Sequence, residues 1–367
     1  MTLVFPAPSL AKSTASGLEG VIAAETVLSE VDGAKGQLVL RGKAIEDLAG
    51  KLTFEEAIAF FWDGLIETET SLEDRLLQGR LKAFELMPVL EAAPRDLPVY
   101  QRMRLGLSAL ADTQSEEDAA AICAALPVFL AASARIQAGL KPVAPDVSLT
   151  ISQDILQMLT GRMPVERAAN ALDRYLVTIL DHGLNASTFT ARVIASTKAD
   201  MASAIIGAMG ALKGPLHGGA PGPVLDMLDA VGTSENADNW VAGELKKGIR
   251  LMGFGHRIYR TRDPRADVLK AGLAELPQED GRIALAEAVE TAALAALRRH
   301  KPDRPLETNV EFYTAVLLEA AGIDRSLFTP LFAVGRSVGW CAHVVEQQQT
   351  GKLIRPASRY TGPMPQI

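Results

Sequence analysis

Four of the five histidines lie in short segments that also hold glycine, arginine or asparagine. These segments are Asp181-His182-Gly-Leu-Asn185, Leu216-His217-Gly-Gly-Ala220, Gly253-Phe-Gly-His256-Arg257 and Gly339-Trp-Cys-Ala-His343. Glycine beside a histidine lets a ligand approach the backbone and leaves the imidazole uncovered. A single histidine of this kind is more often a hydrogen-bonded core residue, but four such segments in one chain favour a binding or catalytic site.

His217 and Glu311 are candidates for moving a proton next to a carbonyl group. His217 precedes glycines, prolines and an apolar run, so we expect it at or just before a helix N-terminus, where the helix dipole keeps an imidazole neutral and able to stabilise an enolate oxygen. Glu311 follows Asn309, an expected N-cap, and would act as the base. The alternatives are a capping histidine in a tight turn and a glutamate favoured only by the helix dipole.

Arginines supply a third kind of candidate. The ones considered for anion binding are Arg257, Arg260, Arg262, Arg265, Arg336 and Arg355. A guanidinium group binds carboxylates and phosphates through two parallel hydrogen bonds, so a di-acid or a phosphorylated ligand fits this set. We expect two or three of the six to be functional and the others to be solvated surface. His300, in the basic segment 298–301, is instead expected at a helix C-terminus.

Other kinds of site are not expected. The chain has no His-x-x-x-His, Glu-x-x-His or Cys-x-x-Cys spacing, so we expect no metal site. The glycine patterns of phosphate loops and dinucleotide sites are incomplete, and we expect no serine nucleophile elbow. Two cysteines, Cys123 and Cys341, are too few for a disulfide framework and indicate a reducing compartment.

Composition excludes further classes. The formal net charge of −7 argues against nucleic acid or an anionic membrane as the main partner. Apolar residues make up 48% of the chain and aromatics only 5%, which favours packed helices around a large core built from Ala, Leu, Ile and Val. The longest uncharged apolar stretch, residues 119–134, is shorter than the roughly 20 residues that span a bilayer. Because no basic and apolar leader is evident, we expect a cytoplasmic protein.

The chain has the pattern of a helical protein from Thr53 onward. Before it, short β segments are expected at 25–29 and 37–40, around a turn at Asp32-Gly33. Thr53 and Glu56 form a capping box. Apolar stripes predict further helices at 119–137, 148–160, 166–182, 186–197, 200–213, 222–231, 236–249, 281–299, 310–321 and 326–348. Helices within 186–213 are apolar on all sides, so we expect a thick all-α bundle that a second subunit partly covers.

Six long motifs resemble those of the citrate synthase family. They are LDHGLNASTFTARVIAST (180–197), ALKGPLHGGA (211–220), MGFGHRIYRTRDPRAD (252–267), TNVEFYTA (308–315), GRSVGWCAHVVEQ (335–347) and LIRPASRYTG (353–362). The resemblance runs from about Gly17 to Gly362, is weakest at 70–145 and is closest to the shorter bacterial form. It implies an all-α homodimer in which a small domain, 217–318, closes over the active site against a large domain made of 1–216 and 319–367.

The resemblance also implies an activity and a role for each motif. The reaction is a condensation of acetyl-CoA with oxaloacetate followed by hydrolysis of the thioester, with no metal or redox cofactor. His217 would polarise the thioester carbonyl, Glu311 would take the methyl proton and His256 would polarise the oxaloacetate ketone. The oxaloacetate carboxylates would be bound by His182, Asn185, Arg265, Arg336 and, from the partner subunit, Arg355. The phosphates of CoA would meet Arg257 and Arg260.

Two departures from the family pattern fall on the acyl-CoA side. The family usually has Asp where this chain has Glu311, and a reacting group displaced by about 1 Å slows catalysis. The family continues after Gly-Gly-Ala with Asn, where this chain has Pro221, which fixes φ and removes a backbone donor. Two alternatives therefore stay open. One is a 2-methylcitrate synthase that uses propionyl-CoA, since one methylene discriminates by only about 1–3 kcal/mol. The other is a weak or inactive family member that binds metabolites as a dimer.

Overall fold

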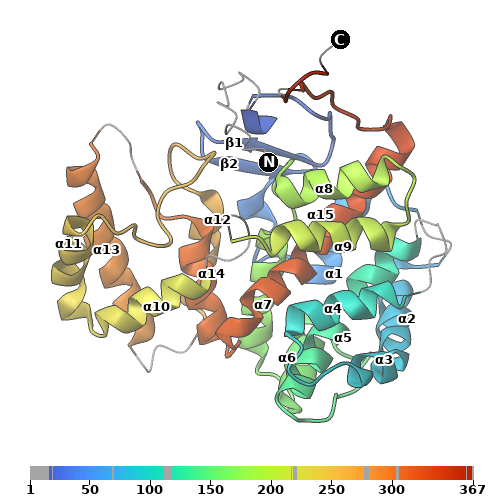
Figure 1. Ribbon diagram of the computed structural model, residues 1–367. Helices are drawn as coiled ribbons and strands as arrows, with labels where there is room; N and C mark the ends of the chain where they lie inside the picture. Colours follow the sequence, from blue (N-terminus) through green and yellow to red (C-terminus); the bar gives the residue numbers. More distant parts are fainter. Residues whose placement is uncertain are drawn as a thin grey trace, which may run out of the picture.

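The computed structural model describes residues 16–18, 20–67, 70–110, 117–215, 217, 221–276, 281–302, 306–360 and 362–365, and most of them are helical (Figure 1). The first helices are α1 (Phe54–Trp62), α2 (Leu72–Glu85), α3 (Met87–Ala92), α4 (Val99–Ser108), α5 (Glu117–Gln137), α6 (Ile151–Thr160), α7 (Glu166–Thr178), α8 (Ala186–Ala195) and α9 (Met201–Leu212). The remaining α-helices are α10 (Pro221–Val231), α11 (Ala237–Lys246), α12 (Pro264–Leu273), α13 (Arg282–His300), α14 (Val310–Ala320) and α15 (Phe328–Thr350). The all-α fold class expected from the sequence is confirmed.

A small antiparallel sheet precedes the helices. Its strands, in the order β1-β2-β3, are β1 (Ser29–Asp32), β2 (Gln37–Leu40) and β3 (Lys43–Ala44). The expected strand at 25–29 is wrong, because pairing begins at Ser29, opposite Leu40. The turn after Asp32 is confirmed: the Asp32 carboxylate accepts the N–H groups of Ala34 and Lys35 at 3.0 and 2.9 Å, which closes the turn.

Capping side chains fix the first residues of helices α1, α12 and α14. The Thr53 and Glu56 capping box is present at α1, as predicted. Asn309 accepts the N–H of Glu311 and begins α14. Asp263 accepts the N–H of Arg265 at the start of α12, where proline occupies the first turn. Each cap is local, and it places a charged side chain in the first turn of its helix.

The core is centred on α5 and α15. Helix α5 packs against α2, α4, α6 and α15, while α15 also contacts α7, α8 and α9. The segment Asp118–Gln137, which extends the uncharged stretch 119–134 at both ends, is long and apolar enough to cross a membrane by length and composition alone. The physical role is different, because 78% of its most apolar window is buried inside the fold. This segment is the core helix of a bundle.

A second group of helices lies to one side of that core. Helices α10, α11 and α13 gather there in Figure 1, and α12 and α14 connect them to the remainder through contacts with α7. This group falls within the predicted small domain, 217–318. The predicted boundaries themselves, with 1–216 and 319–367 as the large domain, stay a prediction.

Several helix predictions need correction. The helix expected at 166–182 ends at Thr178, because a turn at Gly183 with φ +59° follows, and this leaves His182 in a loop. Helices α2, α3, α4 and α12 were not among the predicted stripes. Helix α2 is strongly charged, and α12 is a short helix that begins at Pro264, so neither shows a clear apolar stripe.

Candidate active site

One cavity of about 800 Å³ is lined by residues from seven separate segments of the chain, including the N-terminal segment 17–23. The predicted site residues that line it are His182, Asn185, His217, His256, Arg257, Arg265, Glu311 and Arg336. They come from the loop between α7 and α8, the segment before α10, the loop before α12, and the helices α12, α14 and α15. Their separation along the chain means that only the packing of the helices creates this pocket.

His256 is held in a single orientation by its own loop. Its Nδ1 accepts the N–H groups of Ile258 and Tyr259, both at 3.1 Å, so the ring proton of a neutral His256 lies on Nε2. Burial and the charge of Arg265 lower the pKa of His256 to about 4, which keeps it neutral near pH 7. The Nη2 of Arg265 lies 3.3 Å from Nε2. Because a guanidinium group only donates, a proton on Nε2 brings two donors together here, and a carbonyl or carboxylate oxygen that accepts from both would satisfy them.

His182 packs edge-on against His256, with 5.7 Å between the ring centroids. Its Nε2 lies 3.1 Å from the hydroxyl of Tyr259. Burial, together with the charges of Arg265 and Arg336, holds the pKa of His182 well below its ordinary value. Sequence reasoning did not single out Tyr259, although its position three residues after His256 was a usable signal. The result is an uncharged aromatic cluster beside two buried cations.

Two buried arginines provide the positive charge. Arg265 binds Asp263 through Nε and Nη2, at 3.0 and 2.9 Å. Arg336 donates through Nε to the carbonyl of Ile179 at 2.6 Å and lies over the ring of Phe332. Within the described part of the chain, its terminal nitrogens make no hydrogen bond. Burial, and repulsion from Arg265, lower the pKa of Arg336 to about 10, so both side chains stay charged and attract an anion.

Glu311 faces this cluster from the first turn of α14. Its backbone N–H is used by Asn309, as predicted, while its carboxylate makes no hydrogen bond to the described residues. Burial, with a smaller contribution from Asp263, raises the pKa of Glu311 to about 7, and the charges of Arg265 and Arg336 oppose that rise. A carboxylate with this pKa can accept and release a proton near neutral pH.

His217 is oriented by Ser187 rather than by the helix that follows it. Its Nε2 lies 2.8 Å from Oγ of Ser187, which also accepts the indole N–H of Trp340 at 3.2 Å. Burial and the charge of Arg336 lower the pKa of His217 to about 4. The imidazole is thus neutral, as predicted, but the causes are its surroundings and not only a helix dipole. Nδ1 makes no hydrogen bond to the described residues.

The remaining predicted residues differ in where they lie. Asn185 lines the cavity, but its carbonyl oxygen caps α8 by accepting the N–H groups of Ser187 and Thr188. Arg257 lies exposed at the rim, beside Arg250, which the sequence did not single out. Arg260 is exposed, and it lines neither this cavity nor the adjoining hollow of about 470 Å³. The pocket therefore does not include Arg260.

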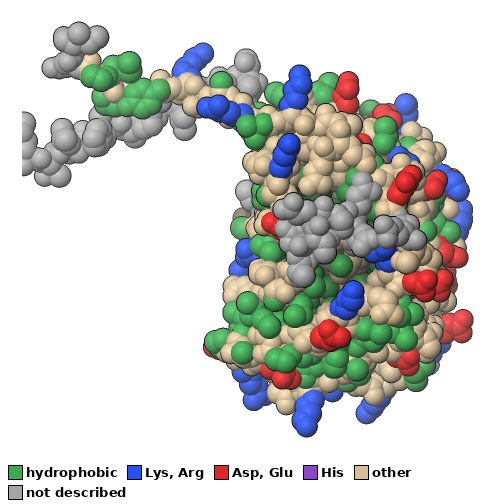
Figure 2. Space-filling model, turned by 90° about the vertical axis from the view of Figure 1, so that its right-hand side faces the viewer, with side chains coloured by type: hydrophobic (Ala, Val, Ile, Leu, Met, Phe, Trp, Pro, Cys, Tyr) green, Lys and Arg blue, Asp and Glu red, His purple; other side chains and the backbone are tan. Residues whose placement is uncertain are grey.

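Arg355 also lies away from the pocket of its own chain. It belongs to the extended segment after α15, where the side chain is exposed and does not line the cavity. This segment runs along the outside of the helices in Figure 1. Figure 2 shows an arm with hydrophobic and basic side chains projecting from the body of the molecule. A role for Arg355 in a pocket thus requires a pocket on another copy of the chain.

A second hollow of about 470 Å³ adjoins the cavity and shares Arg250, Gly255, His256 and Arg257 with it. The apolar residues that line it include Leu245, Ile249, Leu251, Leu297 and Leu306, and the basic ones are Arg250, Arg257, His300 and Lys301. His300 ends α13, as predicted. An apolar floor with a basic rim fits a ligand that joins a flat ring to phosphates.

The structure also bears on two other kinds of site, a serine nucleophile elbow and a metal site. The segment 335–339 has the Gly-x-Ser-x-Gly spacing of a nucleophile elbow, but Ser337 lies inside α15, is fully buried and donates its hydroxyl to the carbonyl of Val334. It is not placed at a strand-to-helix turn. Over the described ranges, no group of three or more His, Cys, Asp and Glu side chains is arranged to hold a metal ion.

A helical fold whose pocket joins a carboxylate base, neutral histidines and buried arginines is that of an enzyme that removes a proton next to a carbonyl. The family model for the citrate synthase C-terminal domain matches residues 17–357. A putative citrate synthase 2 of Mycobacterium tuberculosis is 40% identical over 95% of this chain and 93% of the relative. The citrate synthase of Haloferax volcanii is 40% identical over 94% and 95%. A 2-methylcitrate synthase of M. tuberculosis is 34% identical over 94% and 90%.

Solved structures agree with these relatives. The citrate synthase of Thermotoga maritima superposes with a TM-score of 0.84 at 36% identity, covering 97% of this chain and 98% of the other. A citrate synthase of Thermoplasma acidophilum, solved as a ternary complex with carboxymethyl coenzyme A and oxaloacetate, gives a TM-score of 0.85 at 27% identity, with the same coverage. The chain belongs to the citrate synthase family and is a transferase of that type.

Proposed function

We propose that this enzyme condenses acetyl-CoA with oxaloacetate and hydrolyses the thioester, giving citrate and free CoA. The observation that carries the proposal is the meeting of Glu311, His217, His256 and two buried arginines in one cavity. Oxaloacetate carries two carboxylates and a ketone, which match two guanidinium groups and a neutral imidazole donor. The ternary complex of the Thermoplasma relative contains oxaloacetate and a CoA derivative, which supports the same pair of substrates here.

The first step forms the enol of acetyl-CoA. Ionised Glu311 takes a proton from the methyl group, and His217 donates a hydrogen bond from Nδ1 to the thioester oxygen as the negative charge develops. This role requires the Ser187 hydroxyl, which donates to Oδ1 of Asn185 at 2.8 Å, to turn its proton to Nε2 of His217, because a neutral imidazole has one proton. The distance of 2.8 Å between these atoms suits that hydrogen bond.

The second step joins the carbon atoms. The enol carbon attacks the ketone carbon of oxaloacetate, and the ketone oxygen takes the Nε2 proton of His256. The proton that Glu311 removed from the methyl group then returns through water to restore the neutral imidazole. Arg265 and Arg336 bind the carboxylates and thereby orient the ketone. Water then attacks the thioester carbonyl of the citryl intermediate, and the CoA thiol leaves. Each of these steps uses side chains and water, so we propose no metal or redox cofactor beyond acetyl-CoA as co-substrate.

We propose that CoA binds in the second hollow, beside the cavity. The hollow rimmed by Arg250, Arg257 and Lys301 adjoins His256 and fits an adenine ring with phosphates. The exposed position of Arg260 makes it the weaker of the two predicted CoA contacts. Enolisation requires exclusion of water, so we also propose that the segment 217–318 closes on the remainder after the substrates bind. We expect the enzyme in the cytoplasm.

The proposed homodimer is supported by the exposed arm that holds Arg355. In a dimer, the partner subunit's Arg355 would complete the oxaloacetate site. A complementation assay tests this: Arg355→Gln and Glu311→Gln proteins, each inactive, are mixed, unfolded and refolded together. If the arms cross, each mixed dimer has one intact site and random pairing restores about a quarter of the parental activity. Absence of any recovery in confirmed mixed dimers would count against the shared site.

Thiol release tests the activity directly. Purified protein with acetyl-CoA should release CoA thiol only when oxaloacetate is added, and Glu311→Gln should remove that signal. The same assay with propionyl-CoA compares kcat/KM for the two acyl groups. A higher value for propionyl-CoA would replace the proposal with 2-methylcitrate synthesis. Oxaloacetate binding without any turnover would indicate the inactive metabolite-binding dimer.

A further inference from the structure

His343 is a buried histidine that the proposed reaction does not use. It lies on α15, fully inaccessible, with Nδ1 at 2.8 Å from Nη1 of Arg192 and Nε2 at 3.4 Å from Oδ2 of Asp181. A guanidinium group only donates hydrogen bonds, so Nδ1 must accept and the ring proton must lie on Nε2. His343 therefore has one defined role in this contact, as a donor to Asp181.

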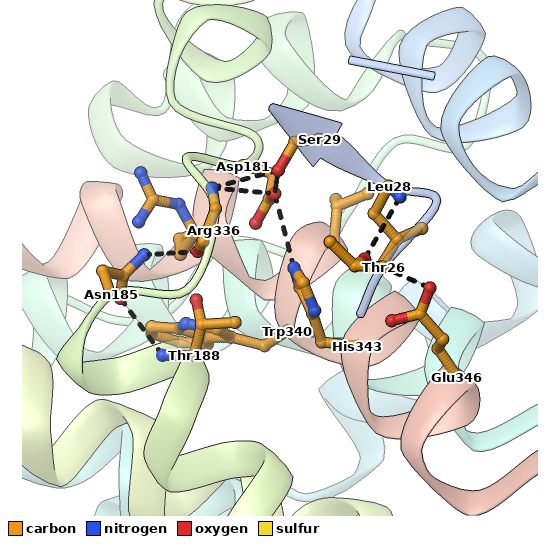
Figure 3. Close-up of polar contacts among 12 residues, drawn as sticks. Thr26, Leu28, Ser29, Asp181, Asn185, Thr188, Arg336, Trp340, His343 and Glu346 are labelled. Carbon is orange, nitrogen blue, oxygen red and sulfur yellow. Dashed lines mark hydrogen bonds and ion pairs between the residues drawn. The ribbon is translucent and has the colours of Figure 1, made fainter. Parts of the chain in front are cut away.

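Arg192 is held in place from its other side. Its Nη1 lies 2.5 Å from Oε2 of Glu346, and its Nε donates to Gln347 at 3.1 Å. The second oxygen of Glu346 accepts the hydroxyl of Thr26 at 3.1 Å and the N–H of Val27 at 2.9 Å. Figure 3 shows Glu346 reaching Thr26 in the segment that leads into β1. The orientation of the His343 ring is thus fixed by a buried ion pair.

Asp181 connects His343 to the turn that carries His182, which lines the cavity. Its Oδ2 accepts the hydroxyl of Ser29 and the N–H of Gly183, the latter at 3.2 Å, and Ser29 accepts the same N–H at 3.0 Å. These bonds close the turn whose middle residue is His182. The other oxygen, Oδ1, makes no hydrogen bond within the described chain. Because this carboxylate is buried, the loss of any one of the donors to Oδ2 would destabilise it.

We propose that His343 is a positioning residue for the oxaloacetate half of the pocket. By donating to Asp181 it fixes the turn that carries His182, and it keeps the negative charge of Asp181 near Arg336. The acyl-CoA half, at Ser187 and His217, has its own support in Trp340. The substrate named here rests on the proposed function, whereas the effect on the turn does not.

Two substitutions separate the two contacts of the ring. In His343→Asn, the amide oxygen lies near the place of Nδ1 and can still accept from Arg192, but no donor reaches Asp181. In His343→Gln, the longer amide reaches the place of Nε2 and restores a donor. We expect His343→Asn to raise KM for oxaloacetate about tenfold or more, with KM for acetyl-CoA within about twofold of the parent. His343→Gln should stay within about threefold in both.

Equal effects of the two variants, or parallel changes in both KM values, would overturn the inference. A readout without turnover is hydrogen exchange of the peptide that covers residues 181–185 in the ligand-free protein. His343→Asn should speed exchange at Gly183, as should Ser29→Ala, which removes the other side-chain partner of that turn, while His343→Gln should not. Unchanged exchange in His343→Asn and Ser29→Ala would also overturn it. A parent protein that releases no thiol counts against the proposed function, and the exchange measurement still decides this inference.

Discussion

Asp263 and Arg265 form a buried ion pair in which both carboxylate oxygens meet the guanidinium group, at 3.0 and 2.9 Å. The same carboxylate accepts the N–H of Val310 at 3.0 Å, one residue before Glu311. One anion thus supports both the arginine proposed to bind oxaloacetate and the helix that carries the proposed base. It also adds to the rise of the Glu311 pKa, so the two halves of the chemistry share this support.

Replacing Asp263 tests that shared support. Asp263→Ala leaves the guanidinium of Arg265 buried without its partner and removes the cap of α12, so we expect a loss of about 3–5 kcal/mol in the free energy of unfolding. The two backbone N–H groups bind different oxygens of Asp263, so Asp263→Asn keeps an acceptor for only one of them and should lose less than Asp263→Ala. Urea unfolding measures both. If both variants are as stable as the parent, the ion pair is not what holds this region together.

The pH dependence of catalysis should report Glu311. Because the base must be ionised, kcat/KM should rise with pH and level off above about 7, the pKa of Glu311. His217 and His256 have pKa values of about 4 and stay neutral across this range. Glu311→Gln should lower kcat by about 10²–10⁴-fold and abolish this limb. Glu311→Asp is the matched control: increased activity would identify the longer side chain as a handicap, and lost activity would identify it as the adapted base.

Ionised Glu311 should also lower the free energy of unfolding at alkaline pH. Its pKa is raised in the folded state, so its favourable contribution is present below the unfolded value of 4.5 and is lost as pH rises through about 7. The difference corresponds to about 3 kcal/mol at most. We expect Glu311→Gln to gain stability relative to the parent between pH 5 and pH 8. Urea unfolding at both values measures this, and a pH-independent difference would contradict the raised pKa.

His217 and Ser187 should behave as a pair. His217→Ala removes the donor to the thioester oxygen, and we expect kcat to fall about 10²–10³-fold with little change in oxaloacetate binding. Ser187→Ala leaves the imidazole in place without its partner and should cause a smaller fall. In the double variant the effects should not add, because Ser187 acts through His217. Fully additive losses would show that Ser187 contributes separately.

The turn between β1 and β2 supports the loop of His256. The carbonyl of Gly33 accepts the N–H of Arg260 at 2.8 Å, and a Cβ at Gly33 would lie 2.3 Å from the carbonyl oxygen of Ile258. Gly33→Ala should therefore displace this loop and raise KM for oxaloacetate. Gly243→Ala, in an open position on α11, is the control and should be neutral or stabilise by about 0.5–1 kcal/mol. Unchanged kinetics in Gly33→Ala would mean that the turn contacts the loop of His256 without positioning it.

Much of the local structure could be read from the sequence, because its causes lie within a few residues. The capping box at Thr53 and the cap by Asn309 need only neighbouring backbone groups, and both were predicted. Helices with a clear apolar stripe were found, while α2 and α12 were not. The end of α7 was missed because the turn at Gly183 is closed by Ser29, more than 150 residues earlier in the chain.

The chemical candidates were also evident from residue types: histidines beside glycine, a glutamate after an N-cap, and a set of arginines. Their properties were decided only by the tertiary structure. The pKa of about 7 for Glu311 depends on burial and charge from distant segments, and the donor role of His343 depends on Arg192, about 150 residues earlier. The proton on Nε2 of His256, by contrast, is set by N–H groups of its own loop. Exposure separates Arg265 and Arg336 from Arg260 and Arg355. Local sequence does not contain that information, because desolvation and Coulomb interactions depend on which elements pack around a group.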